Sequence, residues 1–538
     1  MRLNSRLAAA LAVASTMMTA LPALAATRIT EAAIPAPVAA GQLAPAGRMA
    51  ADTVMAVSVS LPVRHPAARD AMLRAIYDPA SANYRHFLTV AQYAAQFGPT
   101  KADFAAAADY FRSMGLTVDD SAANRSLLKL TGRAADIERA FHVTMNYYQH
   151  PTEHRLFFAA DRTPSVDTNV RLLDVIGLDN YQLPQPRLIR PQETAMGART
   201  TGSGPNGAFL GSDMRAAYYG RGTLTGAGQT VGLMELAGYN LTSVQTYFSK
   251  VGQPLNVPVT GIATDSAPLG CTGSCDDSEQ ALDIEYTISM APGLAGVEVY
   301  VGNNAEDVLN SQVSRDTSQI VSTSWGWNEK FTTDDNIFKE MALQGQTNLT
   351  ASGDYSSLLA SGPWPEEDAN ITAVGGTDLV TNGPGGTWKS ETGWSSSAGG
   401  PSVDKTILIE PYQLPYINTA NGGSTTLRNV PDVAAQANIN MYYCANSGCG
   451  VAGGTSFASP MWAGFVALAN QQAASEGHGP AGWINPILYQ YGNTKYYKFL
   501  FHDETSGKSG KFTCTTNYDL VTGLGSPSTD MIKLLSRY

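Results

Sequence analysis

The sequence predicts an α/β protein of two units, a parallel sheet with helices on both faces and, before it, a smaller α+β unit. Three observations indicate this architecture. After residue 207, strand-like and helical patterns alternate, which is typical of parallel βαβ units. Before residue 184, the patterns suit two helices packed on an antiparallel sheet. Residues 184–207 are rich in Pro, Arg, Thr, Ser and Gly and predict a linker between the units.

The N-terminus has the features of a secretory signal peptide. Arg2 and Arg6 precede an apolar run over residues 7–21, and small residues end at Ala25. We therefore exclude residues 1–25 from the fold, with a signal anchor as the alternative. No later stretch is apolar for long enough to span a bilayer. A secreted, extracellular protein is expected, or one delivered to the periplasm, with no membrane contact after signal removal.

The first unit is expected over residues 51–183. Residues 26–50 have no periodicity and predict a poorly ordered leader. Alternating apolar residues over 54–63 predict the first strand. Helices are then predicted over 66–77, 90–97, 101–114 and 134–141, and strands over 127–130 and 144–148.

The linker is an attractive place for proteolytic cleavage. Arg187, Arg190 and Arg199 lie in it among residues of low hydrophobicity. Exposed polar segments between compact units are preferred protease sites, so we expect maturation cleavage within residues 184–207.

The second unit is expected over residues 208–538. In parallel sheets, ligands bind at the carboxyl ends of the strands, so residues that follow strands are the first candidates for a site. Strands are predicted over 228–235, 296–301, 319–324, 347–352 and 371–374, and helices over 241–249, 277–289 and 305–315.

Composition and cysteines limit the partners. Charged residues make up only 15% and the formal net charge is −11, which argues against an electrostatic partnership with nucleic acid. Cys271 with Cys275, and Cys444 with Cys449, are spaced for small loop disulfides, which leaves Cys514 unpaired. Zinc is the alternative, but no histidine lies near either pair.

The stretch 453–464 reads GGTSFASPMWAG and predicts a tight turn followed by a buried helix. Ser456 would then lie at a helix N-terminus, where N–H groups and the helix dipole favour the negative charge of an attacked carbonyl. This makes Ser456 a candidate nucleophile. The alternative is a structural turn with Ser456 as an N-cap.

A serine nucleophile needs a general base, and histidine is the usual one. None of the seven histidines lies between the linker and Ser456, so an Asp, His, Ser order within the second unit is excluded. Glu279 and Asp283 lie four residues apart on a predicted helix, with no Lys or Arg between residues 276 and 290. Sharing a proton would raise one pKa and lower the other, so Glu279 could act as base and Asp283 could orient it. The alternative is a solvated acidic face.

Asp354 follows the predicted strand that ends at Ser352, after a glycine that permits a sharp turn. If protonated, Asp354 could donate a hydrogen bond to an oxyanion beside the Ser456 N–H. The alternative is an Asx-turn residue.

Together these motifs resemble the sedolisin family of serine-carboxyl peptidases, which have a subtilisin-like fold and a prodomain. The match includes the serine motif 454–460, the acidic helix turn 279–283, the Ser-Gly-Asp turn 352–354 and the Ser-Trp-Gly stretch 324–326. Residues 84–88 resemble the activation propeptide of the pro-kumamolisin type, whose α+β unit is ferredoxin-like. The resemblance implies Ser456 as nucleophile, Glu279 as base, Asp283 as its partner and Asp354 as oxyanion donor.

The resemblance also implies one structural calcium ion near the C-terminus. Its ligands would be the side chains of Asp503 and Asp519 and the backbone carbonyls of Glu504, Thr515 and Asn517. Two carboxylates with carbonyls and water suit calcium. The chain departs from the family at Thr515 and Asn517, where glycines are usual.

The expected protein is thus a secreted, acid-acting endopeptidase made as a self-processing zymogen. Its prodomain would chaperone and inhibit the second unit until acid loosens the contact and the linker is cut. Protein or peptide substrates and a monomeric state are expected. A catalytically inactive, peptide-binding relative is the alternative, and an esterase is disfavoured by the missing histidine base.

Overall fold

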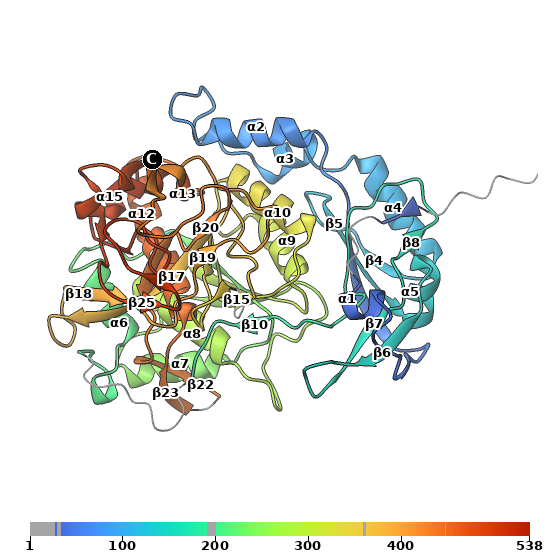
Figure 1. The fold of residues 1–538 in the computed structure, drawn as a ribbon, viewed down its shortest axis with the longest axis horizontal. Helices are drawn as coiled ribbons and strands as arrows, with labels where there is room; N and C mark the ends of the chain where they lie inside the picture. The colour runs from blue at the N-terminus through green and yellow to red at the C-terminus, as the bar shows by residue number, and fades with distance from the viewer. Residues whose placement is uncertain (1–26, 30–33, 191–200, 359–361, 447, 538) are drawn as a thin grey trace, which may run out of the picture.

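The computed structural model describes residues 27–29, 34–190, 201–358, 362–446 and 448–537. The predicted signal peptide, residues 1–25, lies outside them, as does Arg199 of the predicted linker. Figure 1 shows two lobes: the first, coloured blue to teal, holds the N-terminal third, and the second, green to red, holds the rest. None of the helices in these described ranges is long and apolar enough to cross a membrane.

The second lobe is built on an eight-stranded sheet in the order β12-β13-β11-β14-β16-β17-β18, with β21 also paired to β17. Neighbours run parallel except β17 with β18. The central strand β11 has β13 on one side and β14 on the other, so strand order reverses there. The strands are β11 Thr230–Glu235, β12 Val259–Ala263, β13 Gly296–Val301, β14 Ile320–Thr323, β16 Thr347–Ala351, β17 Thr372–Thr381, β18 Trp388–Gly393 and β21 Val433–Gln436.

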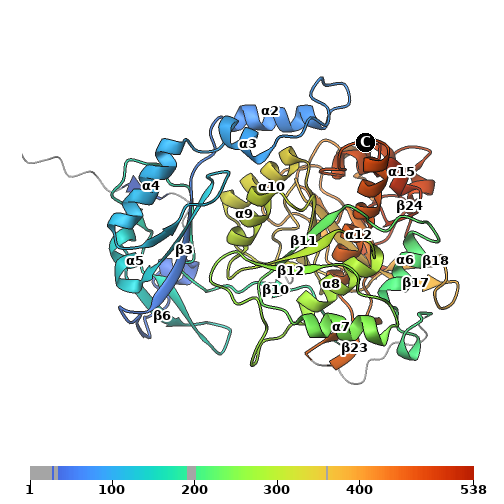
Figure 2. The ribbon, with the colours of Figure 1, turned by 180° about the vertical axis from the view of Figure 1, so that it is seen from behind.

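Helices cover both faces of this sheet, as predicted. Val231 and Leu233 of β11 belong to the core that also contains α7 Leu241–Lys250, α8 Ser278–Met290 and α12 Thr455–Ser475. Met234, the next residue, belongs to the core with α9 Ala305–Arg315 and α10 Thr332–Gln344. Alternate strand residues therefore face opposite helix layers, and Figure 2 shows α8 and α9 on either side of β11 and β12.

The first lobe contains the antiparallel sheet β4-β5-β3-β9 covered by two helices, α4 Lys101–Ser113 and α5 Ala134–Phe141. This confirms the predicted α+β unit, including the helix over 134–141. The sequence did not indicate strand β7, which pairs with β6 in a second sheet. The strands are β3 Val54–Ser60, β4 Thr117–Asp119, β5 Leu127–Arg133 and β9 Val175–Ile176, with β2 Gly47–Arg48, β6 Met145–Gln149 and β7 Leu156–Ala160 in the second sheet.

The prediction of a poorly ordered leader over residues 26–50 was wrong for its described part. β2 pairs with β6, and Val38 and Met49 are buried in the first lobe. Only a few apolar residues of this segment enter the core, so they leave no periodic pattern in the sequence, and their order comes from tertiary pairing.

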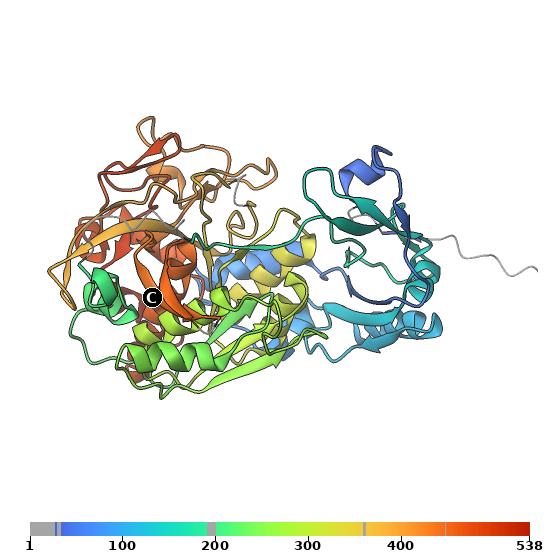
Figure 3. The same cartoon turned by 90° about the horizontal axis from the view of Figure 1, so that it is seen from below.

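The two lobes share an interface with two parts. Helices α2 Pro66–Ile76 and α3 Val90–Gln96 lie along α10, as Figures 1 and 2 show, and the Tyr77 hydroxyl donates to the Ala342 carbonyl at 2.7 Å. At the other part, Ser58 Oγ donates to Asp307 Oδ1 at 2.6 Å. Figure 3 shows the lobes side by side with chain crossing between them. The first lobe is therefore docked on the second.

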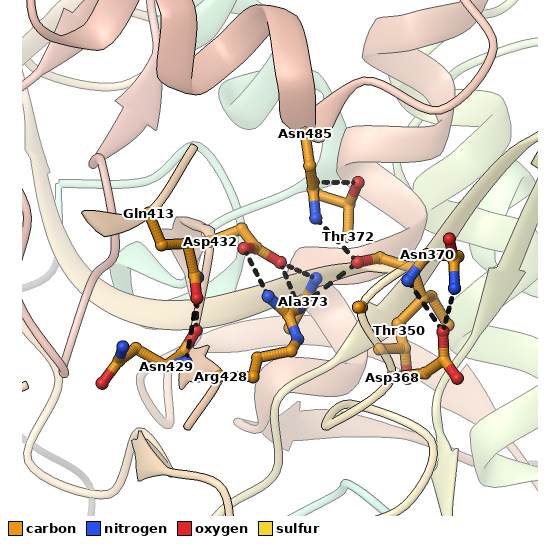
Figure 4. Close-up of polar contacts among 12 residues, drawn as sticks. Thr350, Asp368, Asn370, Thr372, Ala373, Gln413, Arg428, Asn429, Asp432 and Asn485 are labelled. Carbon is orange, nitrogen blue, oxygen red and sulfur yellow. Dashed lines mark hydrogen bonds and ion pairs between the residues drawn. The ribbon is translucent and has the colours of Figure 1, made fainter. Parts of the chain in front are cut away.

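A buried polar network anchors the start of β17. Arg428 forms a two-fold ion pair with Asp432, with Nη1–Oδ1 3.0 Å and Nη2–Oδ2 2.6 Å, and both side chains are fully buried (Figure 4). Asp432 Oδ2 also accepts from the Ala373 N–H at 2.8 Å. Asn485 donates to the Ile371 carbonyl and accepts from Thr372. Such a charge pair is tolerated in the core because its oxygens are hydrogen-bonded.

Both predicted disulfides are confirmed, Cys271–Cys275 and Cys444–Cys449, and Cys514 is buried and free. The remaining described elements are short and lie mainly in connections. They are β1 Thr27–Arg28, α1 Ala36–Ala39, β8 Ser165–Val166, β10 Gln185–Pro186, η1 Pro205–Gly207, α6 Gly211–Tyr218, β15 Trp325–Gly326, β19 Gly400–Pro401, η2 Leu414–Tyr416, β20 Asn429–Val430, β22 Met441–Ala445, β23 Gly448–Ala452, α13 Asn485–Gly492, α14 Tyr497–Leu500, β24 Phe501–His502, β25 Lys508–Ser509, β26 Phe512–Thr513, β27 Ser526–Pro527 and α15 Met531–Leu535.

Candidate active site

Ser456 is the second residue of the buried helix α12, as the sequence predicts. Gly454 precedes the helix with φ +138°, a conformation that favours glycine. Pro460, one turn later, has no N–H to donate to the Ser456 carbonyl. Ser324 Oγ donates to that carbonyl instead, at 3.3 Å. Because of the proline, the Ser456 carbonyl can accept from Ser324, and this hydrogen bond joins the start of α12 to the end of β14.

Glu279 and Asp283 lie on α8, whose thirteen residues are all buried. Their side chains are 3% and 0% exposed, so the alternative of a solvated acidic face is wrong. Ser324 Oγ donates to Asp283 Oδ1 at 2.8 Å. The Ser456 hydroxyl lies beside the Glu279 carboxyl and lowers its pKa, although neither has a hydrogen bond of ordinary geometry. The structure thus brings the three predicted side chains into one cluster.

A third carboxyl group, Glu235, joins this cluster and was missed by the sequence reasoning. It ends β11 and is fully buried, and the Trp325 indole donates to its Oε2 at 3.0 Å. The Glu235 carboxyl lies close enough to that of Asp283 to raise the pKa of Asp283. The available signal was position, since Glu235 ends a predicted strand at the carboxyl edge of the sheet.

Burial raises the pKa values of all three carboxyls. Desolvation is the largest cause for Glu279 and for Asp283, and the charge of Glu235 raises both further. The pKa of Glu235 itself is raised to about 8, again mainly by burial. The expectation that one pKa of the pair is lowered was therefore wrong, because the covered site removes water from both groups.

Asp354 lies beyond β16, after Gly353 at φ +98°. Its Oδ1 accepts from the Thr455 N–H at 3.0 Å and from the Thr455 hydroxyl at 3.1 Å. Thr455 Oγ1 in turn accepts from the Gly353 N–H at 3.0 Å. Burial raises the pKa of Asp354 to about 7, and the Thr455 N–H opposes that rise. Asp354 is thus fixed to the residue before Ser456.

The described part of the predicted linker crosses this cluster. Strand β10 pairs antiparallel with β15, and Arg187 N–H donates to the Ser324 carbonyl at 2.9 Å. The N–H of Ser456 donates to the Arg187 carbonyl at 3.1 Å. Ile189 then pairs with Gly453. In Figure 1, β10 lies beside β15 between the lobes. A backbone carbonyl of the chain itself therefore lies against the N–H of Ser456.

The two histidines that follow the linker make contacts elsewhere. The His502 ring stacks on Trp388 with centroids 4.0 Å apart, and His478 Nδ1 lies 2.9 Å from the Ser536 carbonyl. Among the described residues, the hydrogen bonds of the Ser456 cluster involve carboxyl, hydroxyl, indole and backbone groups and no imidazole. The carboxyls are thus the candidate bases.

The predicted calcium residues come together in one loop after β24. The Asn517 N–H donates to Asp503 Oδ1 at 3.1 Å, and the Thr515 N–H donates to Asp519 Oδ2 at 3.2 Å. Asn517 has φ +65°, which asparagine tolerates, and Thr515 is not left-handed. Replacement of the usual glycines therefore does not prevent the loop from forming.

The donor chemistry of this loop suits a cation. Asp503, Glu504 and Asp519 each raise the pKa of the Tyr497 hydroxyl, so the three carboxyls surround it. In the part of the chain that the structure describes, none of the three forms an ion pair with Lys, Arg or His. They are not grouped as three side-chain ligands of one metal in the described residues. The set therefore fits a calcium ion held by two carboxylates and backbone oxygens.

Comparison with known proteins agrees with this geometry. The family described as "Pro-kumamolisin, activation domain" matches residues 42–181. Kumamolisin from Bacillus sp. (strain MN-32) is 30% identical over 473 residues, covering 81% of this chain and 83% of the relative. Sedolisin from Pseudomonas sp. (strain 101) is 26% identical over 545 residues, covering 91% and 89%.

A solved structure also matches. It is Pseudomonas sedolisin, a serine-carboxyl proteinase, complexed with two molecules of pseudo-iodotyrostatin. The TM-score is 0.54 at 24% identity, covering 63% of this chain and 98% of that one, which shows a shared fold. The chain belongs to the sedolisin family of serine-carboxyl peptidases, with the family's activation domain before a subtilisin-like peptidase unit.

Proposed function

We propose that this peptidase is a secreted, acid-acting endopeptidase made as a self-processing zymogen. The observation that carries the proposal is the hydrogen bond from the Ser456 N–H to a carbonyl of its own linker, beside the carboxyl cluster. A peptide carbonyl held there is in position for attack by the Ser456 hydroxyl.

The proposed roles follow from the contacts. Ser456 Oγ attacks the carbonyl carbon while Glu279 takes the hydroxyl proton. Asp283, held by Ser324 and lying near Glu235, orients Glu279. Asp354, in its protonated form, donates to the oxyanion together with the Ser456 N–H. The C–N bond then breaks, the leaving amine takes a proton, and water hydrolyses the acyl-enzyme.

The pH range is set by two carboxyls with opposite requirements. Asp354 must be protonated to donate, and its pKa of about 7 satisfies this in acid. Glu279 must be ionised to accept a proton. Burial raises its pKa, and the Ser456 hydroxyl beside it opposes that rise. We therefore propose activity below neutrality.

We propose that cutting the linker, rather than protonation of the interface, releases the first lobe. At the interface, Asp307 accepts from Ser58, and Glu340 accepts from Asn124 at 3.1 Å. Burial raises the pKa of Asp307 to about 6 and that of Glu340 to about 8. Because burial at the interface raises the pKa of both carboxyls, their protonation favours the docked state. At these two groups, acid therefore strengthens docking. This proposal differs from the expectation that acid loosens the contact.

Calcium binding is also proposed, by the side chains of Asp503 and Asp519 and the carbonyls of Glu504, Thr515 and Asn517. A bound ion would neutralise the buried carboxyls and stabilise the C-terminal loop. A monomer exported to an oxidising compartment is proposed as well, and the two disulfides support the compartment.

The test of the function is hydrolysis of a denatured protein at pH values from roughly 3 to 7, the range of carboxyl titration. The full-length protein should shorten and digest the substrate in acid, and the Ser456→Ala variant should do neither. Normal maturation of purified Ser456→Ala, or activity that peaks above neutrality, would contradict the proposal. Binding of peptides without hydrolysis would instead support an inactive relative.

A further inference from the structure

We propose that the enzyme cuts after arginine, that Glu366 selects this residue, and that the first bond it cuts is Arg187–Leu188 of its own chain. This inference rests on the proposed function and adds to it the substrate class and the position of the cut. It comes from the placement of residues 185–189 in the active site.

Residues 185–189 lie in the site as an extended substrate would. Before the bond, Gln185 and Pro186 pair antiparallel with Gly326 and Trp325. After the bond, Ile189 exchanges two hydrogen bonds with Gly453, at 2.7 and 3.0 Å. Both flanks are therefore held as β-strand additions, and the peptide between them is fixed in register.

The carbonyl in front of the nucleophile belongs to Arg187. It accepts from the Ser456 N–H at 3.1 Å. A Cβ on Gly454 would lie 2.1 Å from the same oxygen and 3.0 Å from Leu188 Cα, so the peptide lies directly against the turn before Ser456. Within the described part of the linker, Arg187–Leu188 is the bond presented for attack.

The Arg187 side chain fills a pocket built for its charge. It is 2% exposed, and its Nη2 donates to Glu366 Oε1 at 3.0 Å and Oε2 at 3.1 Å. Nη2 also donates to the Gly362 carbonyl. A Cβ on Gly326 would lie 1.6 Å from Nη2, so this glycine leaves the space that the guanidinium occupies. The pocket therefore combines a buried carboxylate with room for a long side chain.

Glu366 makes the pocket selective. The Glu366 side chain is fully buried, and Arg187 is its only ion-pair partner in the described chain. Burial raises its pKa and the guanidinium opposes that rise. An uncharged residue in the pocket would leave the buried Glu366 carboxyl without the hydrogen bonds that the guanidinium donates, and in acid that carboxyl would be protonated and unsatisfied, which costs more than losing a surface contact. Lysine is one atom shorter, so we expect it to be used less well than arginine.

Arg190 provides the contrast within the same linker. It pairs with Asp276, but the two side chains are 52% and 47% exposed. Exposed pairs contribute little and select weakly. Arg190 therefore serves as the matched control for Arg187.

The self-cleavage step is balanced as follows. Ser456 Oγ forms a bond to the Arg187 carbonyl carbon and gives its proton to Glu279. The bond to the Leu188 nitrogen breaks, and that nitrogen takes the proton as the new N-terminus. Water then releases a chain that ends in the carboxylate of Arg187.

The first experiment incubates the purified full chain in acid and identifies the earliest new N-terminus by mass spectrometry and Edman sequencing. We expect Leu188 for the wild type and for Arg190→Ala, and at least about a 100-fold slower cut for Arg187→Ala. A first cut elsewhere, with Arg187→Ala processed at the wild-type rate, overturns the inference.

The second experiment measures kcat/KM for peptides that differ only at the residue before the cut, with Arg, Lys, Ala, Phe or Glu. The wild-type enzyme should have a kcat/KM about 100-fold higher for the Arg peptide than for the Ala peptide. This comparison tests the selectivity without any variant. The ratio should collapse in Glu366→Gln and, through loss of space, in Gly326→Ala.

The two proposals fail in different ways. Cleavage without a preference for Arg, or an unchanged preference in Glu366→Gln, overturns this inference and leaves the proposed function intact. Absence of cleavage of every peptide and of denatured protein by the wild type overturns the proposed function, and this inference with it.

Discussion

Two acidic regions of the second lobe contain carboxyls of similar number and burial. The hydrogen-bond donors around those carboxyls differ between the two regions. In the active site, Glu235, Glu279 and Asp283 face one another, and their donors are side chains, Trp325 and Ser324. In the C-terminal loop, Asp519 accepts from the N–H groups of Val521 and Thr522, both at 2.8 Å, and of Thr515.

The difference lies in the backbone. N–H groups of a folded loop are fixed dipoles that favour carboxylates as anions, and those around Asp519 oppose the rise that burial causes in its pKa, which reaches about 7. Glu235, Glu279 and Asp283 accept no hydrogen bond from a backbone N–H in the described chain, and burial raises their pKa values. The same chemical group is therefore prepared for proton transfer in one region and for cation binding in the other. The predictions below test this contrast, from the largest effect to the smallest.

The largest effect is expected from removing the proposed nucleophile or base. Ser456→Ala or Glu279→Gln should slow self-cleavage by about 10⁴-fold or more, because the attacking group or its proton acceptor is lost. The rate is measured by densitometry of the full-length band in acid. Glu285→Gln is the control, since Glu285 lies on the same helix, is also buried, and faces Cys444 instead. Equal losses in both glutamate variants would mean a folding defect.

A smaller effect is expected at Glu235, which touches Asp283 rather than the substrate. Glu235→Gln should lower kcat by about 100-fold, because loss of the carboxyl beside Asp283 changes the protonation and position of the group that orients Glu279. KM should change little, and the acid limb of the pH profile should move. If Glu235→Gln leaves the pH profile unchanged and loses activity only in proportion to its loss of folded protein, the role of Glu235 is structural alone.

Stability should rise as the pH falls from 8 to 5. The pKa of Glu235 in the folded state is about 8, above its ordinary value of 4.5, so the folded state binds a proton in this range that the unfolded state does not. The Tm of a Ser456→Ala zymogen, which stays uncut, should therefore be roughly 2–4 °C higher at pH 5. Glu235→Gln in the same background should lose part of this rise. A Tm that falls over this interval would contradict the raised pKa.

Calcium removal should have the smallest effect and should spare the active site. EGTA should lower the Tm of the uncut protein by roughly 2–4 °C, because the loop loses its cation. Asp503→Asn should abolish the response, and Glu279→Gln should keep it. Calorimetric titration with Ca²⁺ provides a readout independent of activity. An identical Tm with EGTA and with excess calcium would contradict the proposed calcium site.

Much of the fold and site could be predicted from local patterns. The helix over 134–141 and the acidic pair on the helix over 277–289 follow from spacing, which depends only on helix geometry. The missing histidine pointed to carboxyls because nucleophile chemistry requires a base whatever the fold. The poorly ordered leader was a wrong prediction, since residues that enter a core by pairing across the lobe leave no local signal.

The sequence by itself determined the order of the motifs, the family resemblance and the two candidate disulfide pairs, because short-range spacing and residue chemistry carry that information. Only the tertiary structure decided which distant groups meet. It brought Glu235 to Asp283 from a separate strand, raised the pKa values by excluding water, and laid Arg187 across Ser456 and against Glu366. Those contacts join residues on separate elements, 179 positions apart for Arg187 and Glu366, and no local pattern specifies the desolvation or register that such packing creates.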